Sequence, residues 1–162
     1  VTEKSMQENI RVHLNSYSWL AKLAADNMRD NGTQGSIIQF SSIYGLVGQN
    51  LNIYRRAEGM GENMTYSIIK GGITNFTRQL ASYYGKYNIR VNNICPGAII
   101  GNDKSTGKKQ NKNFLKNYKN QVPLKRLATP KEIAGATLFL TSDLSSYVTG
   151  TNLIVDGGWT AI

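Results

Sequence analysis

The fold is decided by residues 65–97, which read TYSIIKGGITNFTRQLASYYGKYNIRVNNICPG. Apolar side chains recur at a helical period over 65–87, and this pattern predicts an amphipathic helix. The apolar run that follows, 89–95, predicts a buried strand, and Pro96 and Gly97 end it. A strand that directly follows a helix of this length is typical of a parallel sheet with helical crossovers.

The same alternation continues on both sides of this unit. Toward the start of the chain, the pattern predicts an amphipathic helix over 1–31, a short buried strand over 36–40 and an irregular loop over 43–64. Toward the end, it predicts a helix over 129–140 and a last strand over 152–155. Apolar strands linked by helices indicate an α/β fold in which helices cover both faces of a parallel sheet.

Composition places the chain among single-domain globular proteins. Of 162 residues, 40% are hydrophobic and 18% are charged, which suits a chain with a real core. We therefore expect one domain over 1–162, in which 98–128 forms a flap. No apolar run is long enough to span a membrane, and the first residues lack the apolar run of a signal peptide, so we expect a cytoplasmic protein. The single Cys95 excludes an internal disulfide, and we expect no metal site.

The charge of the chain is unevenly distributed. The formal net charge is +9, and residues 86–132 hold eleven Lys and Arg residues but only Asp103 and Glu132 as acids. Three interpretations are open: a nucleic-acid surface, a lid that faces a phosphate-bearing small molecule, or a solvated lysine-rich loop. Aromatic side chains do not alternate with the cations as base stacking requires, so nucleic-acid binding is disfavoured.

Tyr66 and Lys70 are candidates for acid–base chemistry. Because they are four residues apart in a predicted helix, their side chains project from one face about one turn apart. An ammonium group near a phenol favours the ionised phenol, so Tyr66 becomes a candidate general acid or base. The same spacing also occurs among solvated surface residues, and the neighbouring segments decide between the two interpretations.

Two further segments converge on the same place. Ser42 follows the first predicted strand, and Pro96-Gly97 follows the second. Ligands of open α/β sheets bind beyond the carboxyl ends of the strands. A serine hydroxyl at this edge can hold a substrate oxygen while Tyr66 moves its proton. The sequence therefore predicts one site that contains Ser42, Tyr66 and Lys70.

Three segments, in this order, resemble the short-chain dehydrogenase/reductase family over nearly the whole chain. They are SIIQFSSIYG (36–45), YSIIKGGITNFTRQLASYYGKYNIRVNNICPGAI (66–99) and ATPKEIAGATLFLTSDLSSYVTGTNLIVDGGW (128–159). The resemblance implies an oxidoreductase that uses NAD or NADP. It also implies that a hydride passes between the nicotinamide and a carbinol or carbonyl carbon of the substrate.

The resemblance implies a role for each matching residue. Tyr66 is the expected catalytic acid or base, and Ser42 is the expected partner of the substrate carbonyl. Lys70 is expected to promote the ionisation of Tyr66 and to hold the nicotinamide ribose, so both residues also contact the cofactor. The family's loop around the nicotinamide is matched by Pro96, Gly97 and Ile99.

Two of the chain's departures from the family pattern concern the catalytic residues and the cofactor. His13 stands where the family usually has an asparagine, so it is expected either to replace that asparagine in a catalytic proton relay or to pack. No glycine-rich phosphate loop is present, and its place in the family lies before Val1. The resemblance therefore implies a partial Rossmann-like doubly wound parallel sheet that lacks its first βαβ units, and a chain that is inactive by itself.

The loop SSIYGLVGQNLNIYRRAEGMGENMTY (41–66) and the ending GTNLIVDGGWT (150–160) most resemble the oxidoreductases of flagellin modification and legionaminic acid biosynthesis. That subgroup implies an anionic sugar as substrate, either a sugar phosphate or a nucleotide sugar. The cations that would attract its phosphate are Arg55, Arg56, Lys108 and Lys109. The resemblance also implies a homo-oligomer that forms through helices 4–31 and 65–87.

Two alternative functions stay open. In the first, the chain is a truncated family member that acts as a non-catalytic dimerisation or binding module. In the second, the enzyme is a 3-oxoacyl-thioester reductase, although such a substrate gives the flap no reason to be so cationic. Turnover of a nicotinamide cofactor separates the first alternative from an enzyme, and the accepted substrate separates the second from a sugar oxidoreductase.

Overall fold

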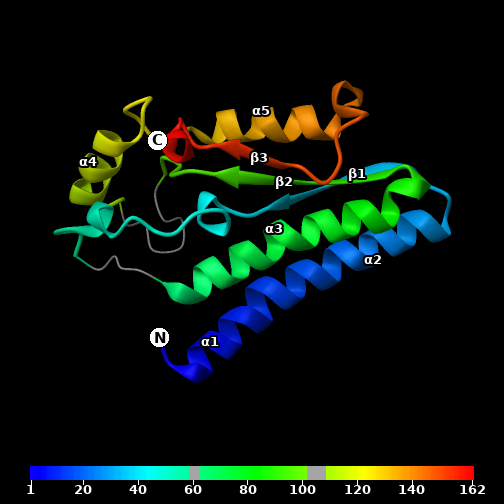
Figure 1. Ribbon diagram of the computed structural model, residues 1–162, viewed down its shortest axis with the longest axis horizontal. Coiled ribbons are helices and arrows are strands. Elements are labelled where there is room, and N and C mark those ends of the chain that lie inside the picture. Colours follow the sequence, from blue (N-terminus) through cyan, green and yellow to red (C-terminus); the bar gives the residue numbers. More distant parts are fainter. Residues whose placement is uncertain (59–62, 102–108) are drawn as a thin grey trace.

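A computed structural model describes residues 1–58, 63–101 and 109–162 of the chain. Three parallel strands form one sheet between two layers of helices (Figure 1). The strands are β1 (Gly35–Phe40), β2 (Ile89–Pro96) and β3 (Asn152–Val155). The helices of more than one turn are α1 (Glu3–Ile10), α2 (Ser16–Asp30), α3 (Met64–Tyr84), α4 (Lys112–Gln121) and α5 (Pro130–Thr141).

The sheet has the order β1-β2-β3, with β2 in the middle. Ile37 of β1 pairs with Val91 of β2, and Ile94 of β2 pairs with Leu153 of β3. Successive side chains of a strand point to opposite faces, and every side chain of β2 from Val91 to Cys95 is buried. Both faces of the central strand are therefore covered, which confirms the predicted α/β class with a parallel sheet.

Helices cover the two faces of the sheet unequally. Figure 1 shows α2 and α3 along one face and α5 along the other. The core under α2 and α3 includes Ala25 and Leu80, and the core under α5 includes Ile94 and Leu140. A third cluster lies around α4 and is formed by Ile53, Tyr118, Val122 and Leu127. This third cluster supports one wall of the site described below.

The first helix differs from the continuous helix predicted over 1–31. A π-helical turn, η1 (Arg11–Asn15), separates α1 from α2, and such a turn shifts the face that the preceding helix presents. Within this turn, Leu14 packs on α3 at Gly72, where an added Cβ would lie 2.9 Å from Leu14 Cδ1. The absence of a side chain at Gly72 therefore makes room for Leu14.

The start of α5 lies where Thr129 and Pro130 predict it. The Thr129 side chain accepts a hydrogen bond from the Glu132 main-chain nitrogen, and Pro130 is the first helical residue. The Glu132 carboxylate in turn accepts a hydrogen bond of 2.7 Å from the Thr129 main-chain nitrogen. Across the residues that the structure describes, no helix combines the length and the apolar character needed to cross a membrane.

Candidate active site

A cavity of about 440 Å³ lies at the carboxyl ends of β1 and β2. Its wall includes Ser42, which follows β1, Tyr66 in the first turn of α3, and Gly97, which follows β2. Two strand ends and one helix therefore meet at one place, as ligand sites of open α/β sheets require.

Lys70 lies one turn further along α3, with its ammonium at the end of β1. Its Nζ donates a hydrogen bond of 3.0 Å to the Phe40 main-chain oxygen and lies 5.6 Å from the centroid of the Tyr66 ring. A second ring, that of Tyr17 in α2, has its centroid 5.8 Å from the same nitrogen. Burial lowers the pKa of Lys70, and the smaller effect of Cys95 opposes this shift. No sequence pattern pointed to Tyr17, because its contact with Lys70 joins two separate helices.

Ser42 is buried and presents its hydroxyl to the cavity. Its Oγ accepts a hydrogen bond of 3.2 Å from the main-chain nitrogen of Tyr44. A serine hydroxyl has one hydrogen and two acceptor positions, so this bond leaves the hydrogen available to a ligand.

A buried polar network holds the end of β1 next to β2. The Ser41 main-chain nitrogen donates a hydrogen bond of 2.9 Å to Asn93 Oδ1, and Asn93 Nδ2 donates one of 2.8 Å to Asn152 Oδ1. Ser41 Oγ also lies 2.8 Å from Thr74 Oγ1 of α3. The network therefore connects the residue before Ser42 to the other two strands and to the helix that carries Tyr66.

The loop after β2 is held in place by a buried phenol. The main-chain nitrogen of Ala98 donates a hydrogen bond of 2.8 Å to Tyr118 Oη. An added Cβ on Gly97 would lie 2.6 Å from the same oxygen, so a side chain at 97 would displace the phenol. Pro96 and Ile99, the other two residues predicted for this loop, are half-buried on either side.

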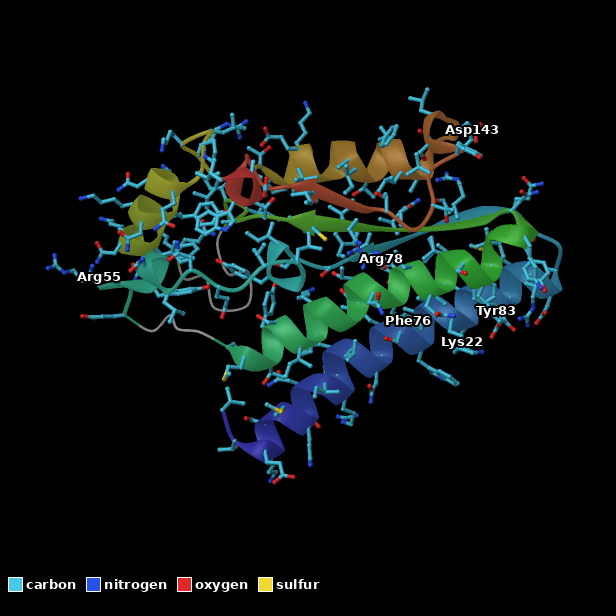
Figure 2. All side chains as sticks on the ribbon, in the orientation of Figure 1. Lys22, Arg55, Phe76, Arg78, Tyr83 and Asp143 are labelled. Carbon is cyan, nitrogen blue, oxygen red and sulfur yellow. The ribbon has the colours of Figure 1, made fainter. Side chains whose placement is uncertain are left out.

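Among the described residues, the predicted site residues other than Ser42, Tyr66 and Gly97 do not line this cavity, Lys70, Pro96 and Ile99 included. His13 is exposed in η1, and its side chain forms no hydrogen bond with any described residue. Arg55 and Arg56 are exposed and line a separate groove of about 530 Å³. Figure 2 shows Arg55 at the outer end of the molecule, on the side of α4. Lys109 is exposed beside Ile100 and Gly101, and Lys108 falls outside the described residues.

Aromatic side chains that the sequence patterns did not single out form much of the cavity wall. Tyr44 and Tyr54 line the cavity from the loop after β1, and Phe114 and Tyr118 line it from α4. Phe114 and Tyr118 are four residues apart, which places both on one face of a helix. This spacing was the signal in the sequence that could have identified the aromatic wall. The rings of Tyr118 and Trp159 stack with their centroids 4.6 Å apart, which supports the wall from behind. No described residue of the wall is charged.

Comparison with known proteins gives matches over nearly the whole chain. Residues 1–160 match the family model described as enoyl-(acyl carrier protein) reductase. The L-rhamnose-1-dehydrogenase of Scheffersomyces stipitis is 35% identical over 161 residues, which cover 98% of this chain and 57% of that protein. The 3-oxoacyl-acyl-carrier-protein reductase of Chlamydia trachomatis is 43% identical over 124 residues, which cover 76% of this chain and 44% of that protein.

A solved structure agrees with these matches. The crystal structure of a short chain dehydrogenase from Leptospira borgpetersenii with bound NAD+ has a TM-score of 0.86 at 38% identity, and the match covers 99% of this chain and 58% of that one. The chain thus spans about half the length of the curated relatives that it matches. Its three-stranded parallel sheet is the Rossmann-like part that these proteins share. By sequence, by fold and by family model, the chain belongs to the short-chain dehydrogenase/reductase family.

Proposed function

We propose that this chain carries the catalytic and substrate-binding part of an NAD- or NADP-dependent oxidoreductase. The enzyme transfers a hydride to or from a carbinol or carbonyl carbon of a sugar. One observation carries this proposal: Ser42 and Tyr66 line one cavity, and the Lys70 ammonium lies 5.6 Å from the centroid of the Tyr66 ring.

Each of these side chains has a distinct chemical task. The Tyr66 phenol gives a proton to the substrate oxygen during reduction and takes it back during oxidation. The Ser42 hydroxyl donates a hydrogen bond to the same oxygen and orients it. Lys70 stabilises negative charge on the phenol oxygen through its ammonium, which the Phe40 main-chain oxygen holds in place.

The residues around the cavity fit the nicotinamide half of the cofactor. Lys70 uses one of its three donors on Phe40, which leaves two for the ribose hydroxyls. Gly97 has no side chain, and Pro96 and Ile99 are half-buried apolar residues that would hold the nicotinamide ring. The bound nicotinamide supplies the carbon that accepts or donates the hydride. The bound NAD+ of the Leptospira relative supports NAD as one of the two candidates.

His13 is proposed as a link between Lys70 and solvent. It lies in η1, four residues before Tyr17, whose ring has its centroid 5.8 Å from Lys70 Nζ. An imidazole ring can both donate and accept a proton, so it can exchange with solvent the proton that Tyr66 gives or takes. Its exposure in η1 suits such an exchange.

The proposed substrate is a sugar, because the Scheffersomyces relative is an L-rhamnose-1-dehydrogenase. The more specific proposal is an anionic sugar, a sugar phosphate or nucleotide sugar used in surface-glycan synthesis or flagellin glycosylation. Its phosphate would lie outside the cavity, either on Arg55 and Arg56 or on Lys109, which are all exposed. A second candidate is a 3-oxoacyl-thioester reductase, which the 43% identical Chlamydia relative supports.

Turnover assays with the full-length enzyme test these proposals. NAD+ or NADP+ is supplied with neutral sugars, sugar phosphates and nucleotide sugars, and NADH or NADPH is supplied with 3-oxoacyl thioesters. Oxidation of a sugar supports the first proposal, whereas turnover of acyl thioesters alone would replace it with the second. Turnover of none of these substrates would favour the non-catalytic module.

We also propose that α2 and α3 form a homo-oligomer interface. Large apolar side chains are exposed on these helices, among them Trp19, Leu20, Leu23 and Ile68. Figure 2 shows Lys22 and Tyr83 along the same two helices. An exposed apolar patch of this kind is typical of a protein interface. Light scattering should show an oligomer that Leu20→Glu dissociates, while Leu138→Glu on α5 leaves it intact.

A further inference from the structure

We propose that the hydroxyls of Tyr54 and Tyr44 determine the specificity of the cavity by binding a hydroxyl of an uncharged polyhydroxy substrate. Simple sugars and sugar alcohols are the main class of such compounds. The inference rests on the proposed oxidoreductase function and narrows its substrate class. It differs from the anionic-sugar proposal, because it assigns recognition to neutral side chains inside the cavity.

The first support is the absence of charge from the described part of the cavity wall. Its polar side chains are hydroxyls and amides, supplied by Ser42, Gln49, Asn63 and the tyrosines. Arg55 and Arg56, the described cations of the same loop, line a different groove. An anionic group that enters the cavity would lose water without gaining a counter-charge there, whereas a neutral hydroxyl loses much less.

The second support is the shape of the aromatic wall. The Tyr54 and Phe114 rings stack with centroids 6.0 Å apart, and the Phe114 and Tyr118 centroids are 5.9 Å apart. A row of packed rings is a firm and apolar surface. It suits the flat carbon-and-hydrogen face of a sugar ring, while a few polar groups fix the orientation of that ring.

The third support is the hydrogen bonding of Tyr54. Gln49 Nε2 donates a hydrogen bond of 3.3 Å to Tyr54 Oη, and Gln49 Oε1 accepts one of 3.3 Å from the Asn63 main-chain nitrogen. Both ends of the Gln49 amide are therefore engaged, which makes Gln49 a positioning residue for Tyr54. Tyr54 Oη acts as acceptor in this pair, so its own hydrogen is left to donate to a ligand.

The fourth support is the unpaired hydroxyl of Tyr44. Tyr44 comes two residues after Ser42 and lines the same cavity, and its Oη is buried without a hydrogen-bond partner among the described residues. Burial, followed by the nearby Tyr54, raises the pKa of Tyr44 far above its usual range, so the phenol keeps its proton and acts as a donor.

An unpaired buried hydroxyl is rare in native proteins, so it marks a position where a ligand hydroxyl is expected. Tyr66 lines the same cavity as Tyr44 and Tyr54. Since Tyr66 handles the reacting oxygen, the hydroxyl that Tyr54 and Tyr44 bind belongs to a carbon near the reacting one.

The test compares binding and turnover of neutral sugars with those of their deoxy analogues. The full-length protein is titrated by calorimetry with D-glucose, each monodeoxy-D-glucose, L-rhamnose, D-sorbitol and D-glucose 6-phosphate, and turnover is measured with the same compounds. For the wild type, at least one deoxy position should weaken binding by about 10- to 100-fold. Tyr54→Phe should remove that discrimination, so that sugar and deoxy sugar bind alike. Tyr87→Phe, which changes a phenol of the short helix after α3, should leave it unchanged.

Thermal unfolding supplies a readout that is independent of the substrate. Because the Tyr44 hydroxyl has no hydrogen-bond partner among the described residues, Tyr44→Phe should leave the Tm unchanged or raise it, while it weakens sugar binding. A lower Tm for Tyr44→Phe would assign the hydroxyl to the fold and overturn the inference.

The other outcomes separate the two proposals. If Tyr54→Phe weakens sugar and deoxy sugar equally, or if only D-glucose 6-phosphate binds, the inference is wrong and the oxidoreductase proposal stands. Binding of no neutral sugar also overturns the inference. Only the loss of all turnover, with every sugar and with 3-oxoacyl thioesters, would overturn the oxidoreductase proposal itself.

Discussion

Ser41 Oγ donates a hydrogen bond of 2.7 Å to the main-chain oxygen of Lys70, 29 residues further along the chain. Lys70 Nζ donates in return to the main-chain oxygen of Phe40, at 3.0 Å. The end of β1 and the second turn of α3 are therefore joined in both directions. Because Ser42 follows directly after this link and Tyr66 lies one turn before it, the link sets the distance between the two groups proposed to bind the substrate oxygen.

Gly45→Ala should disrupt this link. A Cβ at 45 would lie 2.6 Å from both the Lys70 main-chain oxygen and Ser41 Oγ, a distance that real Cβ contacts do not reach. We expect a loss of about 1 to 3 kcal/mol in the free energy of unfolding, measured with urea, together with a fall in turnover. Gly48→Ala is the matched control in the same loop, because a Cβ at 48 meets no atom of the described residues within 4 Å. Equal effects of the two substitutions would contradict the role given to Gly45.

Tyr66→Phe should abolish catalysis without unfolding the protein. The phenyl ring keeps the packing of Tyr66, which is 37% exposed, and only the proton-carrying oxygen is lost. General acid–base catalysis contributes about 10²- to 10⁴-fold to a rate, so kcat should fall by that factor in the full-length enzyme. Circular dichroism and the Tm should match the wild type. A variant that retains more than a tenth of the wild-type kcat would remove Tyr66 from the proposed mechanism.

Asn93→Ala should weaken the fold at the base of the site. Asn93 is fully buried and bonds with Ser41 on one side and Asn152 on the other, so its removal leaves buried polar groups without partners. We expect a loss of about 2 to 3 kcal/mol in the free energy of unfolding. Asn75→Ala, at an exposed position of α3, should change it by less than about 0.5 kcal/mol. Similar changes in the free energy of unfolding for both variants would show that the buried polar network contributes little to stability.

The stability that Glu132 contributes should fall in acid. Hydrogen bonds from Arg126, and then from Thr129, lower the pKa of Glu132 from 4.5 to about 2. The folded state thus binds a proton at Glu132 more weakly than the unfolded state does. The contribution of Glu132 to the free energy of unfolding is therefore complete above pH 4.5 and is lost as the pH falls toward 2. In urea unfolding at a series of pH values, the difference between wild type and Glu132→Gln should shrink over that range. A difference that stays constant with pH would contradict this assignment.

Part of the site follows from local patterns in the sequence. The helical period over 65–87 placed Tyr66 and Lys70 on one face of α3, and the end of an apolar strand placed Ser42 at the rim of the sheet. The cap at Thr129 and the final strand are also where the sequence predicts them. These features depend on interactions between residues only a few positions apart, so the residue order alone determines them.

The remaining features depend on how separate elements pack. Tyr17 reaches Lys70 from another helix, and Tyr54 meets Phe114 across the cavity wall. Arg55 belongs to the same loop as Tyr54 but points into a different groove. Contacts between distant segments depend on how the whole chain folds. In a loop, neighbouring side chains can face opposite sides, and only the folded path of the loop decides which side each one faces. The sequence by itself therefore determined the elements and the reactive pair, and only the tertiary structure decided which rings and charges surround that pair.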